Sequence, residues 1–122
     1  MRPDQKLRMR ILSKKCTDSH SDNDVWEHLE EELAELLLAI KRVRRRREPI
    51  INAIEELVDV HIEINTVLTM INRSDIVEAM VDTKLDKFES MLEKEKETHY
   101  YGGRLLSFVD RYKPIPRIPG NM

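Results

Sequence analysis

The sequence predicts an all-α protein, a bundle of about four helices, and three features indicate it. The composition favours helices, since 36% of the residues are charged, 40% are hydrophobic and the three glycines all lie after residue 100. Apolar residues recur every three or four positions over long stretches, which is the spacing of one helix face. No stretch alternates apolar and polar residues for long enough to build a sheet.

The N-terminal part is predicted as a basic arm over residues 1–20, in which 3–15 form a short helix. A long helix then begins after Ser21 or Asp22, where the spacing of Ser21 and Asp24 resembles a capping box, and runs to about Arg46. Its apolar residues form one stripe that we expect to face a partner helix. The stripe consists of Val25, Leu29, Leu33, Leu36, Ile40 and Val43.

The second long helix is predicted over residues 50–72, directly after Pro49, which is tolerated in a first helical turn. This segment is apolar on most of its circumference, which is typical of a central helix. One apolar face carries Ile54, Leu57, Val58, Ile64 and Leu68. The remaining strip is polar and carries Asn52, Glu56, Asp59, Glu63 and Thr66.

A third long helix is predicted over residues 76–96, capped by Ser74 or Asp75. We expect six of its apolar residues to face inward: Val77, Met80, Val81, Leu85, Phe88 and Leu92. Residues 105–112 are predicted as a short final helix. The division of the chain is then the arm, a helical domain over 21–112 and a Pro-rich tail over 113–122.

Charge and cysteine content narrow the class of protein. The formal net charge is −2, from 21 basic and 23 acidic residues, so the overall balance does not indicate a polyanion-binding protein. The single cysteine, Cys16, cannot form an intrachain disulfide, which agrees with a reducing compartment. No apolar run is long enough to span a membrane, so we expect a cytoplasmic protein without membrane association.

Two pairs of carboxylates are the candidate chemistry. Glu32 and Glu35 border the apolar stripe of the first long helix, and Glu56 and Asp59 share one face of the second. Four converging carboxylates repel one another and lose hydration unless a cation offsets the charge. Clusters of oxygen ligands suit Mg²⁺ or Mn²⁺.

The plainer interpretation is that these acids are solvated and pair with lysine or arginine four residues away, as acids on helices commonly do. The second helix argues against it, because Glu56 and Asp59 have no lysine or arginine at that spacing. Two pairs on consecutive helices are also stronger evidence than one pair.

The two motifs resemble those of a known family. "EELAE" at 31–35 and "EELVD" at 55–59 are similar to the EExxE and EExxD signatures of the MazG-like all-α nucleoside triphosphate pyrophosphohydrolases, and the resemblance covers roughly residues 25–95. It implies a homodimer or homotetramer that holds a nucleoside triphosphate between helices and releases nucleoside monophosphate and pyrophosphate. It also implies four metal ligands, Glu32, Glu35, Glu56 and Asp59, with Mg²⁺ as cofactor and Mn²⁺ as an alternative. Glu32 is the candidate for orienting or deprotonating the attacking water.

Substrate-binding residues are less completely matched. Many relatives carry a lysine on the third helix, followed by Asn and Arg that contact phosphates. Here Lys84 fits the lysine, but Phe88 and Glu89 occupy the other places, so Lys87 and, after the glycine pair, Arg104 are the substitutes we consider. Trp26 is a candidate for stacking on a base, although a lone Trp at the start of an apolar stripe is more often a packing residue.

Two other classes of function compete with the enzyme. The first is a non-catalytic helical module whose acids are surface charge and whose central helix is buried by oligomerisation or by another protein. The second is a nucleic-acid-binding protein that uses "RVRRRR" at 42–47 and the basic arm, but no aromatic platform accompanies these arginines, so it ranks last.

Overall fold

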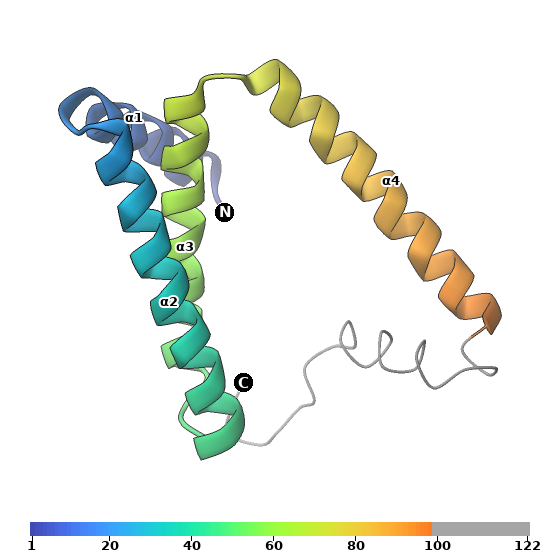
Figure 1. Cartoon of the computed structure of the whole chain (residues 1–122). Helices are drawn as coiled ribbons and strands as arrows, with labels where there is room; N and C mark the ends of the chain where they lie inside the picture. Colours follow the sequence, from blue (N-terminus) through green and yellow to red (C-terminus); the bar gives the residue numbers. More distant parts are fainter. Residues whose placement is uncertain (99–122) are drawn as a thin grey trace. The chain divides into compact units, whose positions relative to one another are not determined.

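The computed structural model describes residues 1–98, which form four helices and no strand, so the predicted all-α class is confirmed for this part of the chain (Figure 1). The helices are α1 (Pro3–Ser19), α2 (Asp22–Arg46), α3 (Ile51–Ile71) and α4 (Ser74–Thr98). The predicted helix at 105–112 and the predicted tail lie outside the described residues. No described helix has the length and apolar character needed to cross a membrane.

The chain divides into two units, residues 1–73 and 74–122, and each is described by itself. The first unit contains α1, α2 and α3. The second contains α4. The division predicted from the sequence, with boundaries after residues 20 and 112, stays a prediction.

Helix α2 has the bounds that its end signals predict. The Ser21 hydroxyl accepts a hydrogen bond from the Asp24 backbone N–H at 3.1 Å, which satisfies a free donor of the first turn. At the other end Arg47 adopts a left-handed conformation, with φ of 54°, and its N–H donates to the Arg42 carbonyl. Pro49 follows two residues later, the chain reverses, and α3 begins at Ile51.

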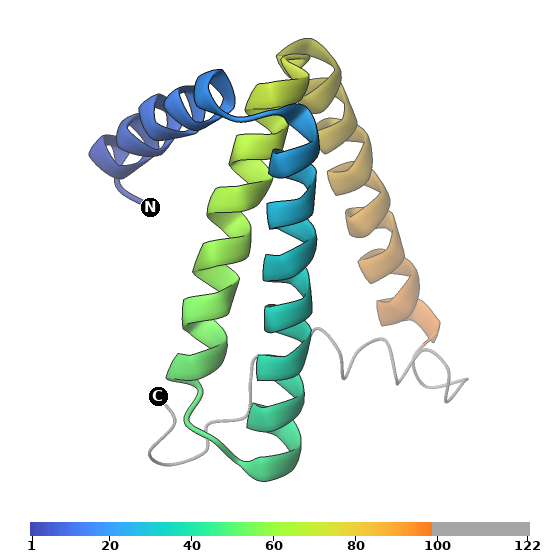
Figure 2. The ribbon, with the colours of Figure 1, turned by 60° about the vertical axis from the view of Figure 1, so that its left-hand side comes forward.

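Helices α2 and α3 form an antiparallel hairpin. Figure 1 and Figure 2 both show the two helices side by side. Helix α3 contacts both α2 and α1, so it is the central helix of its unit, as predicted. The buried apolar residues of the unit are all small or of medium size, which lets the helices approach closely. These residues are Val25, Ala39, Ala53, Val60 and Val67.

One residue of the predicted α2 stripe is not buried. Leu33 is 45% exposed, whereas Val25 is buried and Leu29, Leu36, Ile40 and Val43 are half-buried. Leu33 lies at the edge of the stripe by helical register, and the seam with α3 is too narrow to cover that edge. The prediction that Leu33 faces the partner helix was therefore wrong within this unit.

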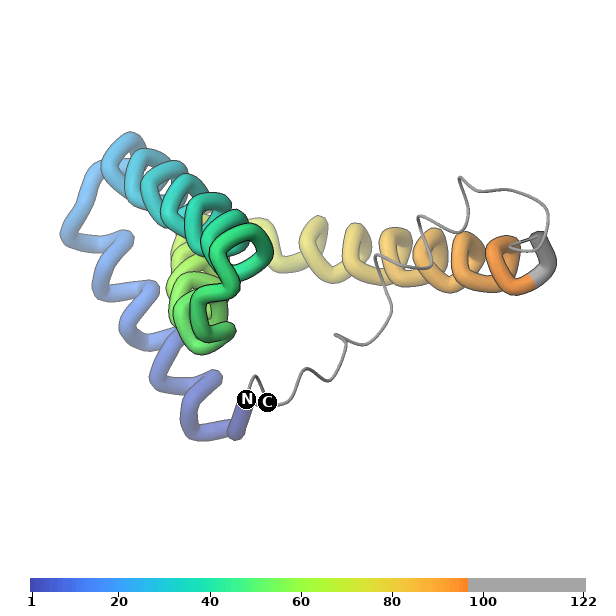
Figure 3. The backbone as a smooth tube through the Cα atoms, turned by 90° about the horizontal axis from the view of Figure 1, so that it is seen from below, coloured from blue at the N-terminus to red at the C-terminus, as the bar shows by residue number. Residues whose placement is uncertain are grey.

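Helix α1 is longer than the predicted segment and packs on α3 (Figure 3). The contact is polar at its centre, where Ser13 is 2% exposed and Thr66 4% exposed. The Asn65 amide donates to the Ser13 hydroxyl at 2.8 Å, the Ser13 and Thr66 hydroxyls lie 3.1 Å apart, and Thr66 donates to the Ile62 carbonyl at 3.1 Å. Because the Thr66 hydroxyl has one hydrogen, Ser13 is the donor to Thr66.

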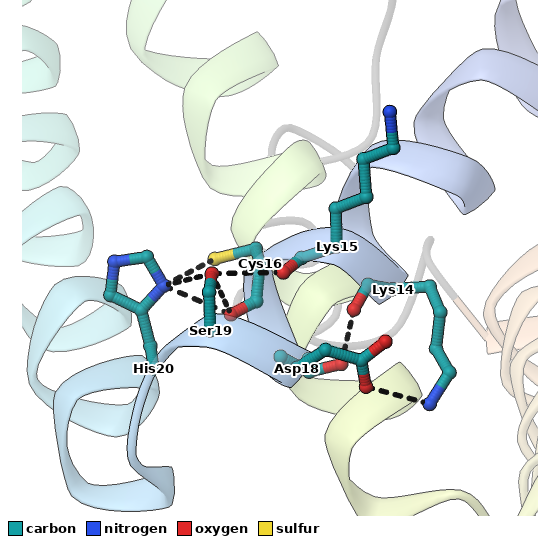
Figure 4. Close-up of polar contacts among 7 residues, drawn as sticks. Lys14, Lys15, Cys16, Asp18, Ser19 and His20 are labelled. Carbon is teal, nitrogen blue, oxygen red and sulfur yellow. Dashed lines mark hydrogen bonds and ion pairs between the residues drawn. The ribbon is translucent and has the colours of Figure 1, made fainter.

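The C-terminal end of α1 is closed by its own side chains (Figure 4). The Nδ1 atom of His20 lies 2.9 Å from the Cys16 carbonyl and 3.0 Å from the Ser19 hydroxyl. Lys14 also pairs with Asp18 one turn further along, at 2.9 Å. These local contacts hold the end of α1 as a defined corner before α2 begins.

Along α4, only Val77 of the apolar residues predicted to face inward is half-buried, and the other five side chains are exposed. A single helix has no second described element of its own unit on which to bury this face. The predicted burial on α4 is therefore not observed within its unit.

The Ser13 contact predicts a measurable contribution to stability. Replacing Ser13 with Ala removes the hydroxyl that accepts from the half-buried Asn65 amide and donates to the buried Thr66 hydroxyl, so we expect a loss of about 1–3 kcal/mol in the free energy of unfolding. Ser19→Ala is the matched control, because Ser19 is exposed and its hydroxyl contacts only groups at the end of its own helix; it should change stability by less than about 0.5 kcal/mol. Urea denaturation measures both, and equal losses would contradict the role assigned to Ser13.

Candidate metal centre

Three carboxylates of the two motifs meet between α2 and α3. Glu32, Glu35 and Glu56 each offer an oxygen atom, and these atoms lie within 4.8 Å of one another. Glu32 and Glu35 are three residues apart, so they share one flank of α2. The antiparallel hairpin then brings Glu56 of α3 opposite that flank. The structure thus gathers three of the four acids that the sequence singled out.

Asp59, the fourth predicted ligand, lies outside this closest group but acts on it. Its negative charge raises the pKa of both Glu32 and Glu56. Its side chain is exposed, one helical turn beyond Glu56 on the same flank of α3. Asp59 therefore borders the cluster from the solvent side.

Burial and mutual repulsion perturb the two half-buried members. Burial raises the pKa of Glu32, and the charges of Glu35, Asp59 and Glu56 raise it further, against the opposing effect of His28. The pKa of Glu56 is raised by burial, then by the charges of Glu35 and Asp59, and by a hydrogen bond to Glu35. A hydrogen bond between two carboxyl groups requires that one of them keep its proton. The fully ionised cluster is therefore unfavourable, and either a retained proton or a bound cation relieves it.

Two oxygen atoms of the cluster have no partner. The Oε2 atoms of Glu32 and Glu56 are inaccessible to solvent and make no hydrogen bond. Within the described residues, none of the four acids forms an ion pair with a lysine or arginine. The Lys or Arg pairs of the plainer interpretation are therefore not formed among these residues, whereas its solvated acids match the exposed Glu35 and Asp59.

His28 is the member of the site that sequence reasoning missed. Its Nε2 atom lies 3.4 Å from Glu32 Oε1, and its Nδ1 atom lies 3.1 Å from Glu63 Oε1 on α3. An imidazolium donates to both carboxylates at once, whereas the neutral ring has one N–H to donate. The four-residue spacing of His28 and Glu32 was a signal for the first contact, but no spacing indicates the second.

Glu63 therefore has a defined partner. Its side chain is only 13% exposed, and its Oε1 atom lies 3.1 Å from His28 Nδ1. Glu63 and His28 thus join α3 to α2 at one end of the carboxylate cluster.

The remaining predicted site residues are not brought to the cluster within the first unit. Trp26 is 44% exposed and, by helical register, lies on the flank of α2 away from Glu32 and Glu35. Lys84 and Lys87 lie on α4, in the second unit. Arg104 lies outside the described residues. His61 is exposed and lines a hollow of about 300 Å³ between α1 and α3.

The residues present fit a hard divalent cation. All the ligand atoms are carboxylate oxygens, and Mg²⁺ and Mn²⁺ prefer such oxygen ligands. Glu32 and Glu56 each also have one buried oxygen atom without a partner. Soft metals that select thiolates find none here, since Cys16 lies on α1 and contacts His20. The exposed side chains of Glu35 and Asp59 leave the solvent face of the cluster accessible to a ligand.

Comparison of the chain with protein-family models, with curated proteins and with solved structures gives no match. The resemblance to the MazG-like family therefore rests on the two motifs and stays a prediction.

The raised pKa values predict how the stability of the metal-free protein depends on pH. A carboxyl group whose pKa is higher in the folded state stabilises the fold below its unfolded value, here 4.5, and this stabilisation is lost as pH rises through the folded value. We expect the urea midpoint in EDTA to fall as the pH rises above 4.5, and Glu56→Gln to reduce this fall.

Glu30→Gln is the control, because Glu30 is exposed on the opposite side of α2. This variant should keep the wild-type pH dependence. If Glu56→Gln has the same pH dependence as the wild type, repulsion at the cluster is not the cause.

Proposed function

We propose that the protein is a Mg²⁺-dependent nucleoside triphosphate pyrophosphohydrolase that releases nucleoside monophosphate and pyrophosphate. The observation that carries the proposal is the cluster of Glu32, Glu35 and Glu56, which comes from both motifs and holds buried carboxylate oxygens without a partner. If the acids had only a structural role, nothing would offset the repulsion between their charges. A cation that bridges them to a triphosphate explains the repulsion and both motifs together.

Glu32, Glu35, Glu56 and Asp59 would hold the ion. A bound Mg²⁺, or Mn²⁺ in its place, supplies charge neutralisation at the triphosphate and stabilises the leaving pyrophosphate. Because the side chains of Glu35 and Asp59 are exposed, the substrate would bind on the solvent side of the cluster.

Glu32 is the proposed base. In the reaction a water oxygen bonds to the α-phosphorus, the bond from that phosphorus to the bridging oxygen breaks, and its electron pair leaves with pyrophosphate. The water must lose a proton, and a carboxylate with a raised pKa is a stronger base than an ordinary glutamate. The contact between His28 Nε2 and Glu32 Oε1 orients the Glu32 carboxylate, and its buried Oε2 atom, which has no partner, would bind the ion.

The substrate contacts belong to the same proposal. Lys84 and Lys87 would bind phosphates from α4, and Trp26 would contact a base. Since Trp26 lies away from the carboxylates of its own subunit, a base contact requires a second subunit. The protein would act in the cytoplasm on the nucleotide pool, removing surplus or damaged triphosphates.

We further propose a homodimer or homotetramer. Apolar residues on the face of α3 away from α2 are exposed in the single chain, which is unusual for a helix of such apolar character. They include Ile54, Leu57, Val58, Ile64 and Leu68. A second copy that buries this face removes it from water.

Sedimentation velocity tests the oligomer. The wild type should sediment as a dimer or tetramer, and Leu57→Lys should shift it towards monomer because a charge is placed in the buried face. Leu7→Lys is the matched control, since Leu7 on α1 is 53% exposed and Leu57 is 51% exposed. A wild type that is monomeric at tens of micromolar would contradict the proposal.

The hydrolysis assay tests the enzyme. Purified protein is incubated with Mg²⁺ and each ribo- and deoxyribonucleoside triphosphate, and the products are separated by ion exchange. We expect monophosphate and pyrophosphate, with a loss of about 10²-fold or more in Glu32→Gln. Glu30→Gln should keep the wild-type rate.

The competing class, a non-catalytic helical interaction module, predicts no cleavage of triphosphate and no stabilisation by metal ions. If no triphosphate is cleaved with Mg²⁺ or Mn²⁺, and neither ion raises the melting temperature, the enzyme is contradicted. The exposed apolar face of α3 then favours the non-catalytic helical interaction module.

A further inference from the structure

The end of α2 carries a dense group of unpaired cations. Six basic residues occupy positions 41–47: Lys41, Arg42, Arg44, Arg45, Arg46 and Arg47. All are exposed, and none forms an ion pair with any described residue. A group of this size exceeds what the partial negative charge of one helix end compensates.

Helical register sorts these cations into two sets. Arg42 follows Glu35 by seven residues and Arg46 follows Glu32 by fourteen, which is close to two and four whole turns. Arg42 and Arg46 therefore lie on the flank of α2 that carries the carboxylates. Arg44 follows Glu35 by nine residues, which places it on the opposite side of the helix.

The separation along the axis is suitable for one extended ligand. Arg42 follows Glu35 by seven residues and Arg46 follows it by eleven, which correspond to roughly 10 Å and 16 Å of helix, and side chains of a helix lean towards its N-terminus. The long Arg42 side chain therefore extends back towards Glu35. The same flank runs from His28 through the carboxylates to the two arginines, so an acidic centre has cations on its C-terminal side.

A nucleoside triphosphate has the complementary pattern. With its α-phosphorus at the carboxylates, the β- and γ-phosphates extend beyond them and carry most of the negative charge. Planar guanidinium groups bind phosphate oxygens with two parallel hydrogen bonds, and unpaired arginines have these donors free. On the other side of the carboxylates, the described flank offers His28, which is already in contact with two acids.

We propose that Arg42 and Arg46 bind the β- and γ-phosphates, the part of the substrate that leaves as pyrophosphate, and so set the direction of the nucleotide along α2. The polyphosphate lies towards the turn between α2 and α3, and the nucleoside lies towards the end of the hairpin that carries His28. This inference rests on the proposed function. It assigns the phosphate contact to two arginines of the first unit, whereas Lys84 and Lys87 belong to the second unit.

Kinetics of three single variants test the direction. Arg42→Gln and Arg46→Gln should each raise KM for the triphosphate and the inhibition constant of pyrophosphate by about tenfold, the effect of losing one charge-assisted hydrogen bond. Arg44→Gln removes the same charge from the opposite side and should stay within about twofold of the wild type. Calorimetric titration of pyrophosphate with Mg²⁺ gives a second readout that does not depend on turnover.

The outcomes separate the two proposals. If the wild type cleaves triphosphate but all three variants match it, the arginines are a solvated helix end and the inference is overturned. Equal losses in all three, with steep salt dependence, mark a diffuse polyanion surface and also overturn it. If the wild type cleaves no triphosphate and binds no pyrophosphate, the proposed function itself has failed.

Discussion

The close packing of α2 against α3 is the interaction on which the rest of the first unit depends. Ala39, Ala53 and Val60 are buried in this seam, and their small side chains let the backbones approach. That approach forces Glu32 and Glu35 towards Glu56, so the apolar seam and the repulsion between carboxylates act against each other. The buried, unpartnered oxygens of Glu32 and Glu56 are the result of this conflict. A divalent cation would convert the repulsion into attraction, which links the stability of the hairpin to its ligand.

The charges along the hairpin form an ordered series. His28 contacts Glu32 and Glu63 at one end, the acids occupy the middle, and the arginines after Ala39 occupy the other end. Helix α1 adds support where α3 ends, because Ser13 bonds Thr66 and Asn65 there. The site is therefore held by packing on one side and by polar contacts at its His28 end, which keeps the carboxylates in place without a lysine or arginine partner.

Local signals were sufficient to predict the helices and the pairing of the motifs. Ser21 and Pro49 mark helix ends by backbone chemistry that acts within a few residues, and the three-residue spacing inside each motif fixes a shared flank. Contacts between distant residues were not predictable in this way. Glu63 finds His28, and Ser13 finds Thr66, only once the helices are packed. Burial of Leu33 and Leu57 was predicted from apolar periodicity, but periodicity identifies a face that is able to be buried and does not identify what covers it.

The most direct test of the account is a crystal structure of the protein grown with Mn²⁺, with anomalous diffraction recorded at the manganese edge. The anomalous signal comes from the manganese ion itself, so it shows directly whether the carboxylates bind a cation. The account predicts an anomalous peak in direct coordination with oxygens of Glu32, Glu35 and Glu56. Hairpins with no peak at millimolar Mn²⁺, and with these carboxylates bonded to one another or to basic side chains, would contradict it.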